Sequence, residues 1–235
     1  MGRKAVAVMV KGRGAQKLFK SQGGFLFTLV GLALAVAGYW GPWVDHFTAA
    51  LVIPGFDLAE YVKFLPEVRA GTVPVTRELF YLPAPAAGLC LALVTGWQRR
   101  RLPGWASWPL AILAAGLALV VAPPPDFVLR FVQDAALRAE WGLQALLAGG
   151  TFLAVVAALI WGRRLSPAVT TLLASLVAGA GAGIPLWQFF AVRPAIDRVY
   201  NQPVTLGWGL WLMVLGFALT VMVAWWQALI TGDKG

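Results

Sequence analysis

The ionisable residues that could do chemistry gather around one histidine. His46 is the single histidine of the 235-residue chain, and Asp45, Asp57 and Glu60 lie near it in the sequence. Imidazole and carboxylate groups bind metals, so these four residues could form a metal site, or His46 could be the axial ligand of a single chlorin. A solvated histidine at a membrane interface needs no ligand. We expect that role for His46, with no bound metal or cofactor.

The residue spacings typical of enzymes are missing from the sequence. It contains no Walker loop, no HExxH zinc motif, no CxxC pair and no promising Ser-His-Asp arrangement. The single cysteine, Cys90, lies inside an apolar run. Asp57 and Glu60 stand one helical turn apart, which is typical of a solvated helix face. We therefore predict no catalytic residue and no enzymatic activity.

The basic residues are spread along the chain, although the formal net charge is +9. They lie in short clusters between apolar runs, which is typical of membrane topology and not of nucleic-acid binding. The first 24 residues hold the largest group, and we predict that it contacts anionic lipid headgroups or a cytoplasmic partner. The fixing of topology alone would explain the same charges. This group consists of Arg3, Lys4, Lys11, Arg13, Lys17 and Lys20.

Small residues at helical spacing indicate helix packing. Ser175, Gly179 and Gly183 repeat every four residues, and such a face lets two helix backbones approach closely in a membrane. We predict that this face packs against another helix, of this chain or of another chain. Gly207 and Gly209 are expected to form a tight turn into the last helix.

The apolar runs that surround these residues predict the fold. Apolar residues make up 60% of the chain and charged residues only 12%, whereas soluble domains carry about 25% charged residues. Six runs free of charge approach the length of about 20 residues that a membrane span requires. We predict an all-α bundle of about six transmembrane helices, near residues 25–43, 79–97, 105–122, 141–161, 167–189 and 206–230.

Tryptophan and arginine support this topology. All 12 tryptophans fall near the ends of the six runs, as expected for aromatic belts at the two interfaces. If residues 1–24 are cytoplasmic, the four cytoplasmic segments hold 12 basic residues and the opposite side holds the other 7 of the 19. We therefore expect residues 1–24 and 231–235 in the cytoplasm of a bacterial plasma membrane, with the first run retained as a signal anchor.

The predicted outer loops, 44–78, 123–140 and 190–205, are longer than the cytoplasmic ones. Residues 56–70 and 126–140 could form short amphipathic helices, the second with Asp126 as its N-cap. Such helices would lie along the interface or cover the bundle. Their exposed aromatic side chains are candidate docking points for a partner, and we single out Phe64, Phe127 and Phe131.

These features predict a non-catalytic accessory or scaffold subunit of a larger membrane complex, of which an energy-transducing complex is one example. Its partners would be other membrane subunits and lipids. The alternative is a small permease or transporter component, although the runs lack the ionisable residues that coupled transport uses. A membrane enzyme that acts on a lipid or a quinone ranks third.

Overall fold

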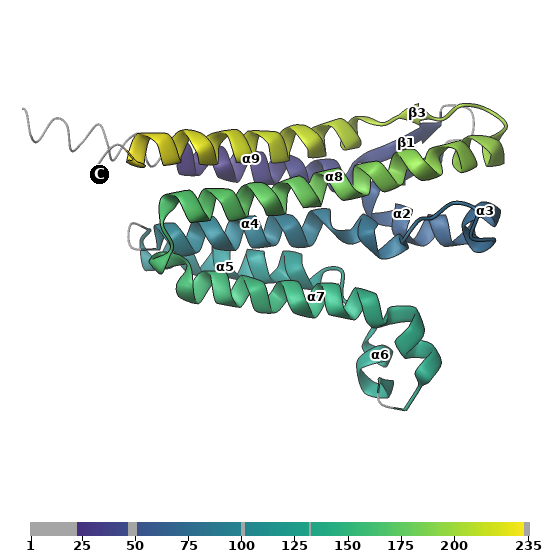
Figure 1. Ribbon diagram of the computed structural model, residues 1–235, viewed down its shortest axis with the longest axis horizontal. Helices are drawn as coiled ribbons and strands as arrows, with labels where there is room; N and C mark the ends of the chain where they lie inside the picture. The colour runs from purple at the N-terminus through teal and green to yellow at the C-terminus, as the bar shows by residue number, and fades with distance from the viewer. Residues whose placement is uncertain (1–22, 47–50, 100–101, 132, 233–235) are drawn as a thin grey trace, which may run out of the picture.

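The computed structural model describes residues 23–46, 51–99, 102–131 and 133–232, and it is mostly helical. Within these ranges, the long helices lie alongside one another in a bundle (Figure 1). They are the N-terminal helix Gly23–Trp40, α4 (Pro83–Gln98), α5 (Gly104–Leu119), α7 (Ala135–Trp161), α8 (Pro167–Tyr200) and α9 (Trp208–Gly232). The shorter elements are β1 (Pro42–His46), β2 (Leu51–Pro54), α2 (Gly55–Tyr61), η1 (Val62–Phe64), α3 (Pro66–Arg69), η2 (Arg77–Tyr81), α6 (Pro125–Arg130), η3 (Gly162–Arg164) and β3 (Thr205–Leu206).

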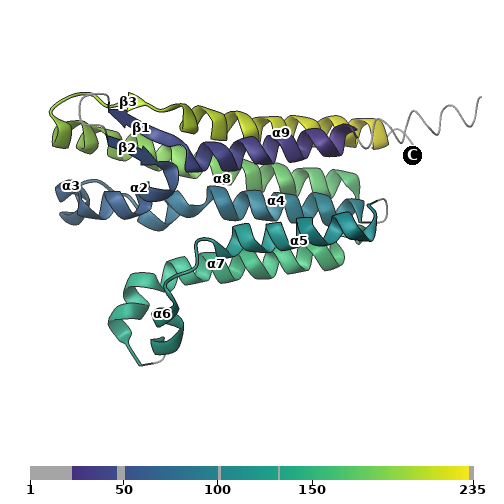
Figure 2. The same cartoon turned by 180° about the vertical axis from the view of Figure 1, so that it is seen from behind.

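The bundle has three layers of paired helices. The N-terminal helix lies beside α9, α4 beside α8, and α5 beside α7 (Figures 1 and 2). Helix α4 is central because it packs against α5, α7 and α8, and all of its residues except Leu89 and Trp97 are buried. Its small residues permit this position. A Cβ atom on Gly88, for example, would lie 2.7 Å from the backbone oxygen of Ala114 on α5.

Within the described residues, four helices are long and apolar enough to cross a membrane: the N-terminal helix, α7, α8 and α9. This agrees with the membrane protein that the composition predicts. Helices α4 and α5 have 16 residues each and so measure about 24 Å at about 1.5 Å per residue. That is less than the ~30 Å thickness of a hydrocarbon core. Because α4 is shielded by its neighbours, its length need not match the lipid.

Helix α7 begins earlier than residue 141, where the predicted span starts. Its N-cap is Asp134, whose Oδ1 accepts hydrogen bonds from the backbone N–H groups of Ala136 (2.9 Å) and Leu137 (3.1 Å). The prediction that Asp126 caps a helix over residues 126–140 is wrong. Asp126 lies in the first turn of α6, whose N-cap is Pro124, and α6 ends at Arg130. Of the two aspartates before this apolar run, the second, Asp134, is therefore the one that caps α7.

Helix α8 extends 11 residues beyond the predicted span end at Phe189 and includes most of the predicted outer loop 190–205. Its buried stripe continues through Phe189, Val192 and Ile196, each 0% exposed, at the spacing of one helix face. The helix ends at Tyr200, followed by Asn201 in the left-handed conformation with φ 52°. A polar turn then leads back to α9.

A small sheet, which an all-α fold does not include, lies at one end of the bundle (Figure 2). Its strand order is β2-β1-β3, and all pairs are antiparallel. Val44 pairs with Ile53 on one side and with Leu206 on the other. Branched apolar residues favour strands, and this short segment lies directly after the N-terminal helix. The sheet thereby connects the start of α9 to the end of the N-terminal helix.

Tryptophan exposure agrees with the predicted belts, with one exception. Most tryptophans at the helix ends are well exposed, among them Trp105 (81%), Trp108 (65%) and Trp187 (63%). Trp43 is 0% exposed, and its Nε1–H donates a 3.2 Å hydrogen bond to the backbone oxygen of Gly38. The N-terminal helix ends at Trp40, before Trp43, so Trp43 belongs to β1 and to the protein core.

Candidate functional site

One stripe of α8 stays open along the bundle, and we name it the open face. Its members are Leu172, Leu176, Gly179, Gly183, Trp187 and Phe190, all of them exposed. A Cβ atom on Gly179 or Gly183 would have no neighbour within 4 Å among the described residues. The predicted small-residue face therefore lies on the outside of this chain. Its packing against another helix stays a prediction, and none of the described helices of this chain is that partner.

The border of the open face is fixed by α9. Trp225 Nε1 donates a 3.1 Å hydrogen bond to Ser175 Oγ, so Ser175 contacts a neighbour inside the chain. One turn earlier, Thr171 Oγ1 donates a 3.2 Å hydrogen bond to the backbone oxygen of Ala224. Both bonds hold α8 against α9. Of the three predicted packing residues, Gly179 and Gly183 remain available to an outside helix.

Glycines do mediate a close helix contact in this chain, but at a place that the sequence reasoning missed. Gly24, Gly31 and Gly38 recur every seven residues on the N-terminal helix, and they face α9, which runs antiparallel to it. Gly31 is opposite Gly216, and Gly38 is opposite Gly209. We name this contact the closed seam. The seven-residue repeat of glycine was the signal that could have revealed it.

The two backbones in the closed seam are too close for side chains. A Cβ atom on Gly216 would collide with the backbone nitrogen of Ala35 and lie 2.6 Å from the backbone oxygen of Gly31. A Cβ atom on Gly38 would collide with the backbone nitrogen of Met213. Gly207 and Gly209 have the same role beside Pro42 and Gly41. They permit close approach, whereas the structure has no tight turn at these glycines: Gly207 directly precedes α9 and Gly209 lies inside it.

Charged residues form a network at the end of the bundle that carries the sheet. Glu60 pairs with Lys63 and accepts a 2.9 Å hydrogen bond from Tyr81 Oη. Arg77 donates from Nε to Glu78 at 2.9 Å and from Nη2 to the backbone oxygen of Glu140 at 2.8 Å. Its guanidinium also lies 4.9 Å from the ring centroid of Trp141. The network thus connects the loop segments to the start of α7.

The electrostatics of this network explain the state of Glu60. Partial burial would raise the pKa of Glu60, but hydrogen bonds from Lys63 and Tyr81 and the charges of Lys63 and Arg77 lower it below its usual 4.5. Among the described contacts, Asp57, one helical turn away on α2, is not part of this network. These ion pairs favour the charged form of Glu60, whereas a general acid would need a raised pKa.

The metal and chlorin interpretations of His46 stay untested. Its backbone belongs to β1, but its side chain lies outside the described part of the structure. Among the residues that the structure describes, no group of three or more histidines, cysteines or carboxylates could hold a metal ion. The basic residues predicted to contact anionic headgroups, Arg3, Lys4, Lys11, Arg13, Lys17 and Lys20, also lie outside the described residues.

The three phenylalanines predicted as docking points differ in exposure. Phe64 on η1 is 68% exposed, with Lys63 Nζ 5.2 Å from its ring centroid. Phe131 is 44% exposed, whereas Phe127 is only 5% exposed and packs edge-on against Phe131 at 5.2 Å. Helix α6, which carries Phe127, projects away from the bundle (Figures 1 and 2). Phe64 and Phe131 therefore offer the accessible surface, and Phe127 supports one of them.

Comparison of the chain with known protein families, with curated proteins and with solved structures finds no match in any of the three.

Proposed function

We propose that the protein is a non-catalytic subunit of a larger membrane complex, with six transmembrane helices and both termini in the cytoplasm. In this topology α4 and α5 are the two short spans. Helix α4 is enclosed by other helices, and α5 exposes Ile112 (68%) and Leu113 (53%) beside the long α7. Both helices are as apolar as a span. Because α4 is enclosed by other helices and α5 lies beside the longer α7, neither needs the full length of the hydrocarbon core.

The open face of α8 is the observation that carries this proposal. In a membrane, helices associate through close backbone contact because lipid tails are as apolar as the side chains. Gly179 and Gly183 offer such a contact, and no described residue of this chain uses it. Exposed leucines flank the glycines, with Trp187 and Phe190 near one end. We assign this face to a membrane-spanning helix of another subunit.

The chemistry of the remaining residues supports a scaffold role. Glu60, Glu67 and Glu78 are each engaged with an arginine or a lysine. The buried hydroxyls of Thr28 and Thr220 donate to backbone oxygens one turn earlier in their own helices. Buried charge in the spans would favour a transporter, and the six predicted spans contain none.

A glycine substitution tests this function. Gly179→Leu fills the open face without touching the rest of the chain, so the folded protein should persist while the complex dissociates. A loss of about 1–3 kcal/mol, typical of an overfilled contact, corresponds to about fivefold to 150-fold weaker association. Native electrophoresis after extraction in mild detergent, with identification of the co-purifying chains, measures it.

The matched control is Gly116→Leu on α5. Gly116 is also exposed, with nothing within 4 Å of a Cβ atom, so its substitution should leave assembly unchanged. If the parent protein migrates as one chain and transports a solute when purified into liposomes, the subunit proposal is wrong. The permease alternative would then take its place.

A further inference from the structure

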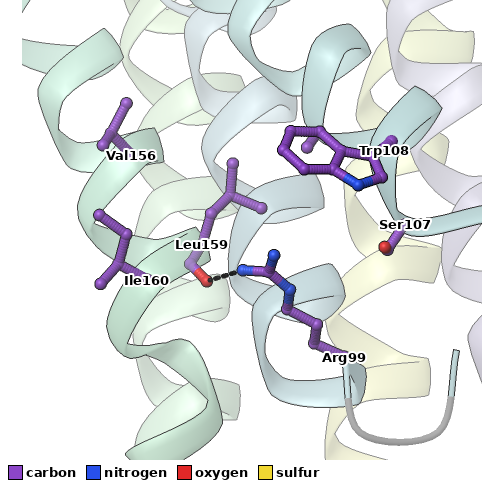
Figure 3. Close-up of a pocket in the computed structure, with 7 residues that line it drawn as sticks. Arg99, Ser107, Trp108, Val156, Leu159 and Ile160 are labelled. Atoms are coloured by element: carbon purple, nitrogen blue, oxygen red, sulfur yellow. Dashed lines mark hydrogen bonds between the residues drawn. The ribbon is translucent and has the colours of Figure 1, made fainter. Parts of the chain in front are cut away.

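A groove between α5 and α7 joins an apolar wall to one arginine (Figure 3). Its volume is about 320 Å³, and it is lined by Arg99, Ser107, Trp108, Ala111, Val156, Leu159 and Ile160. Arg99 follows the last residue of α4, the next three belong to α5, and the last three to α7. The volume lies at the lower end of the ~300–1,000 Å³ range of ligand pockets. That size suits part of one acyl chain.

Arg99 has no acidic partner among the described residues. Its exposed guanidinium makes one long contact, in which Nη1 donates to the backbone oxygen of Leu159 at 3.4 Å (Figure 3). No carboxylate among the described residues lies within ion-pair distance of it, whereas Lys63, Arg77 and Arg198 at the opposite end of the bundle all pair with glutamates. The positive charge of Arg99 is therefore available to a ligand.

The surroundings of Arg99 favour an anion. In the sequence, segments 98–104 and 162–166 contain five arginines and no acidic residue. Two of them, Arg163 and Arg164, are exposed on η3, which packs against α4. A guanidinium binds phosphate oxygens through paired N–H groups. A phosphodiester is thus the expected headgroup.

The exposed tryptophans place the groove at the boundary between headgroups and acyl chains. Trp105 is 81% and Trp108 is 65% exposed at the start of α5, and such rings lie at the headgroup level of a bilayer. Arg99 is at that level, and Val156 is one helical turn deeper than Ile160 on α7. A lipid in this groove would meet charge at one end and apolar side chains below it.

We propose that the groove binds one anionic glycerophospholipid. Its phosphate would contact the Arg99 guanidinium, and part of one acyl chain would lie between Trp108 and Ala111 of α5 and Val156 and Leu159 of α7. This site is independent of the proposed subunit role, because the open face of α8 takes no part in it. Its lining residues include none of the basic residues before residue 25.

A lipid probe with a photoactivatable acyl chain tests the site. The delipidated full-length protein in detergent is irradiated with a phosphatidylglycerol probe or a phosphatidylcholine probe of the same chain length, and the labelled peptides are mapped by mass spectrometry. The phosphatidylglycerol probe should label α5 and α7 at the groove. The phosphatidylcholine probe should label them at least about fivefold less, as expected for about 1 kcal/mol per paired charge.

Variants separate the headgroup contact from the acyl contact. Arg99→Gln should reduce labelling by phosphatidylglycerol about fivefold, to the phosphatidylcholine level, and Ala111→Phe should reduce labelling by both probes because its ring fills the groove. The controls are Arg69→Gln, an exposed arginine at the opposite end, and Ile112→Phe, an exposed neighbour of Ala111 outside the groove. Neither control should change the labelling.

Three results would overturn the site: equal labelling by the two probes, labelling that survives both groove variants, or no labelling of α5 and α7. Competition by millimolar inorganic phosphate as effective as unlabelled phosphatidylglycerol would show a free-phosphate site and also contradict a lipid. Because Arg99 and Ala111 are accessible from outside the bundle, unchanged elution in gel filtration is expected for both variants. Arg99→Lys should retain part of the selectivity and so confirm that the charge matters.

Discussion

The closed seam and the open face use the same residue in opposite situations. In the closed seam, Gly38 and Gly216 lie so close to the facing helix that a Cβ atom would collide with its backbone. On the open face, Gly179 and Gly183 have no neighbour at all within 4 Å among the described residues. Glycine costs a helix about 1 kcal/mol relative to alanine. In the seam, packing inside the chain offsets that cost, and on α8 no described residue does.

This difference shows what a small-residue pattern tells and what it leaves open. A spacing of four or seven residues predicts that a helix can approach another closely. It does not say whether the neighbour belongs to the same chain. The seven-residue repeat before residue 40 packs against the last helix, and the four-residue repeat in α8 has no partner among the described residues. The second pattern is therefore the better indicator of a partner molecule.

The largest expected effect comes from filling the closed seam. Gly216→Leu would place a side chain against Gly31 and Ala35, and overfilling against backbone should destabilise the protein by at least about 3 kcal/mol. We expect most of the variant to aggregate on extraction. The measurement is the monodisperse fraction of the purified single chain in gel filtration after heating, with Gly179→Leu as the control whose fraction should equal that of the parent chain. Equal stability of the two variants would remove the distinction between the two regions.

A single methyl group sharpens the comparison. Gly38→Ala puts a Cβ atom on the backbone of Met213 and should destabilise the protein by about 1–2 kcal/mol despite the better helix propensity of alanine. Gly183→Ala meets nothing and should be neutral or stabilising by up to about 1 kcal/mol. Thermal unfolding of the purified chain in detergent compares them. Destabilisation by Gly183→Ala in the isolated chain would mean that the open face is covered from within.

The smallest expected effect is a loss of stability at acidic pH, which does not involve the closed seam. The pKa of Glu60 is lowered in the folded protein, so its pairing stabilises the fold above the pKa of the unfolded chain. That stability is lost as the pH falls from the usual value of 4.5 through the lower folded value. Since the pair is partly exposed, the loss should not exceed about 1 kcal/mol.

Glu60→Gln tests this assignment, because it keeps the shape of the side chain and removes its charge. The variant should lose less stability than the parent protein over the same pH range, as followed by thermal unfolding. The two facing helices contain no Asp, Glu, His, Lys or Arg between Gly24 and Trp40 or between Trp208 and Gln227, so the closed seam should not respond to acid. An identical acid response of parent and variant would show that Glu60 does not contribute.

The apolar runs and the tryptophans predicted where the long helices lie because these signals are local. Length and hydropathy identify a helix that can cross lipid, and each tryptophan marks its own interface. The same local reasoning assigned Asp126 as a cap, although Asp134 makes the hydrogen bonds. In the sequence, both aspartates precede the same apolar run and look like equivalent helix caps. Only the structure shows that the second one caps α7.

The features that depend on long-range contact could not be predicted. The extension of α8 to Tyr200 follows from burial of Val192 and Ile196 at the end that carries the sheet, and that sheet itself needs β3, far along the chain. The closed seam joins the first helix to the last. The groove beside Arg99 requires the positions of three helices. In each case the relevant neighbour is more than 30 residues away in the sequence.

The pairing of the first helix with the last has a consequence for synthesis of the protein. Gly31 and Gly38 lack their helix contact until α9 has been made, because their partners Gly209 and Gly216 belong to that last helix. At about 5–20 residues per second, that delay is roughly 10 seconds or more. During it, the glycine-lined side of the first helix faces lipid or the insertion machinery. A chain that stops before α9 would carry this unfilled side permanently, and we expect such a chain to be degraded.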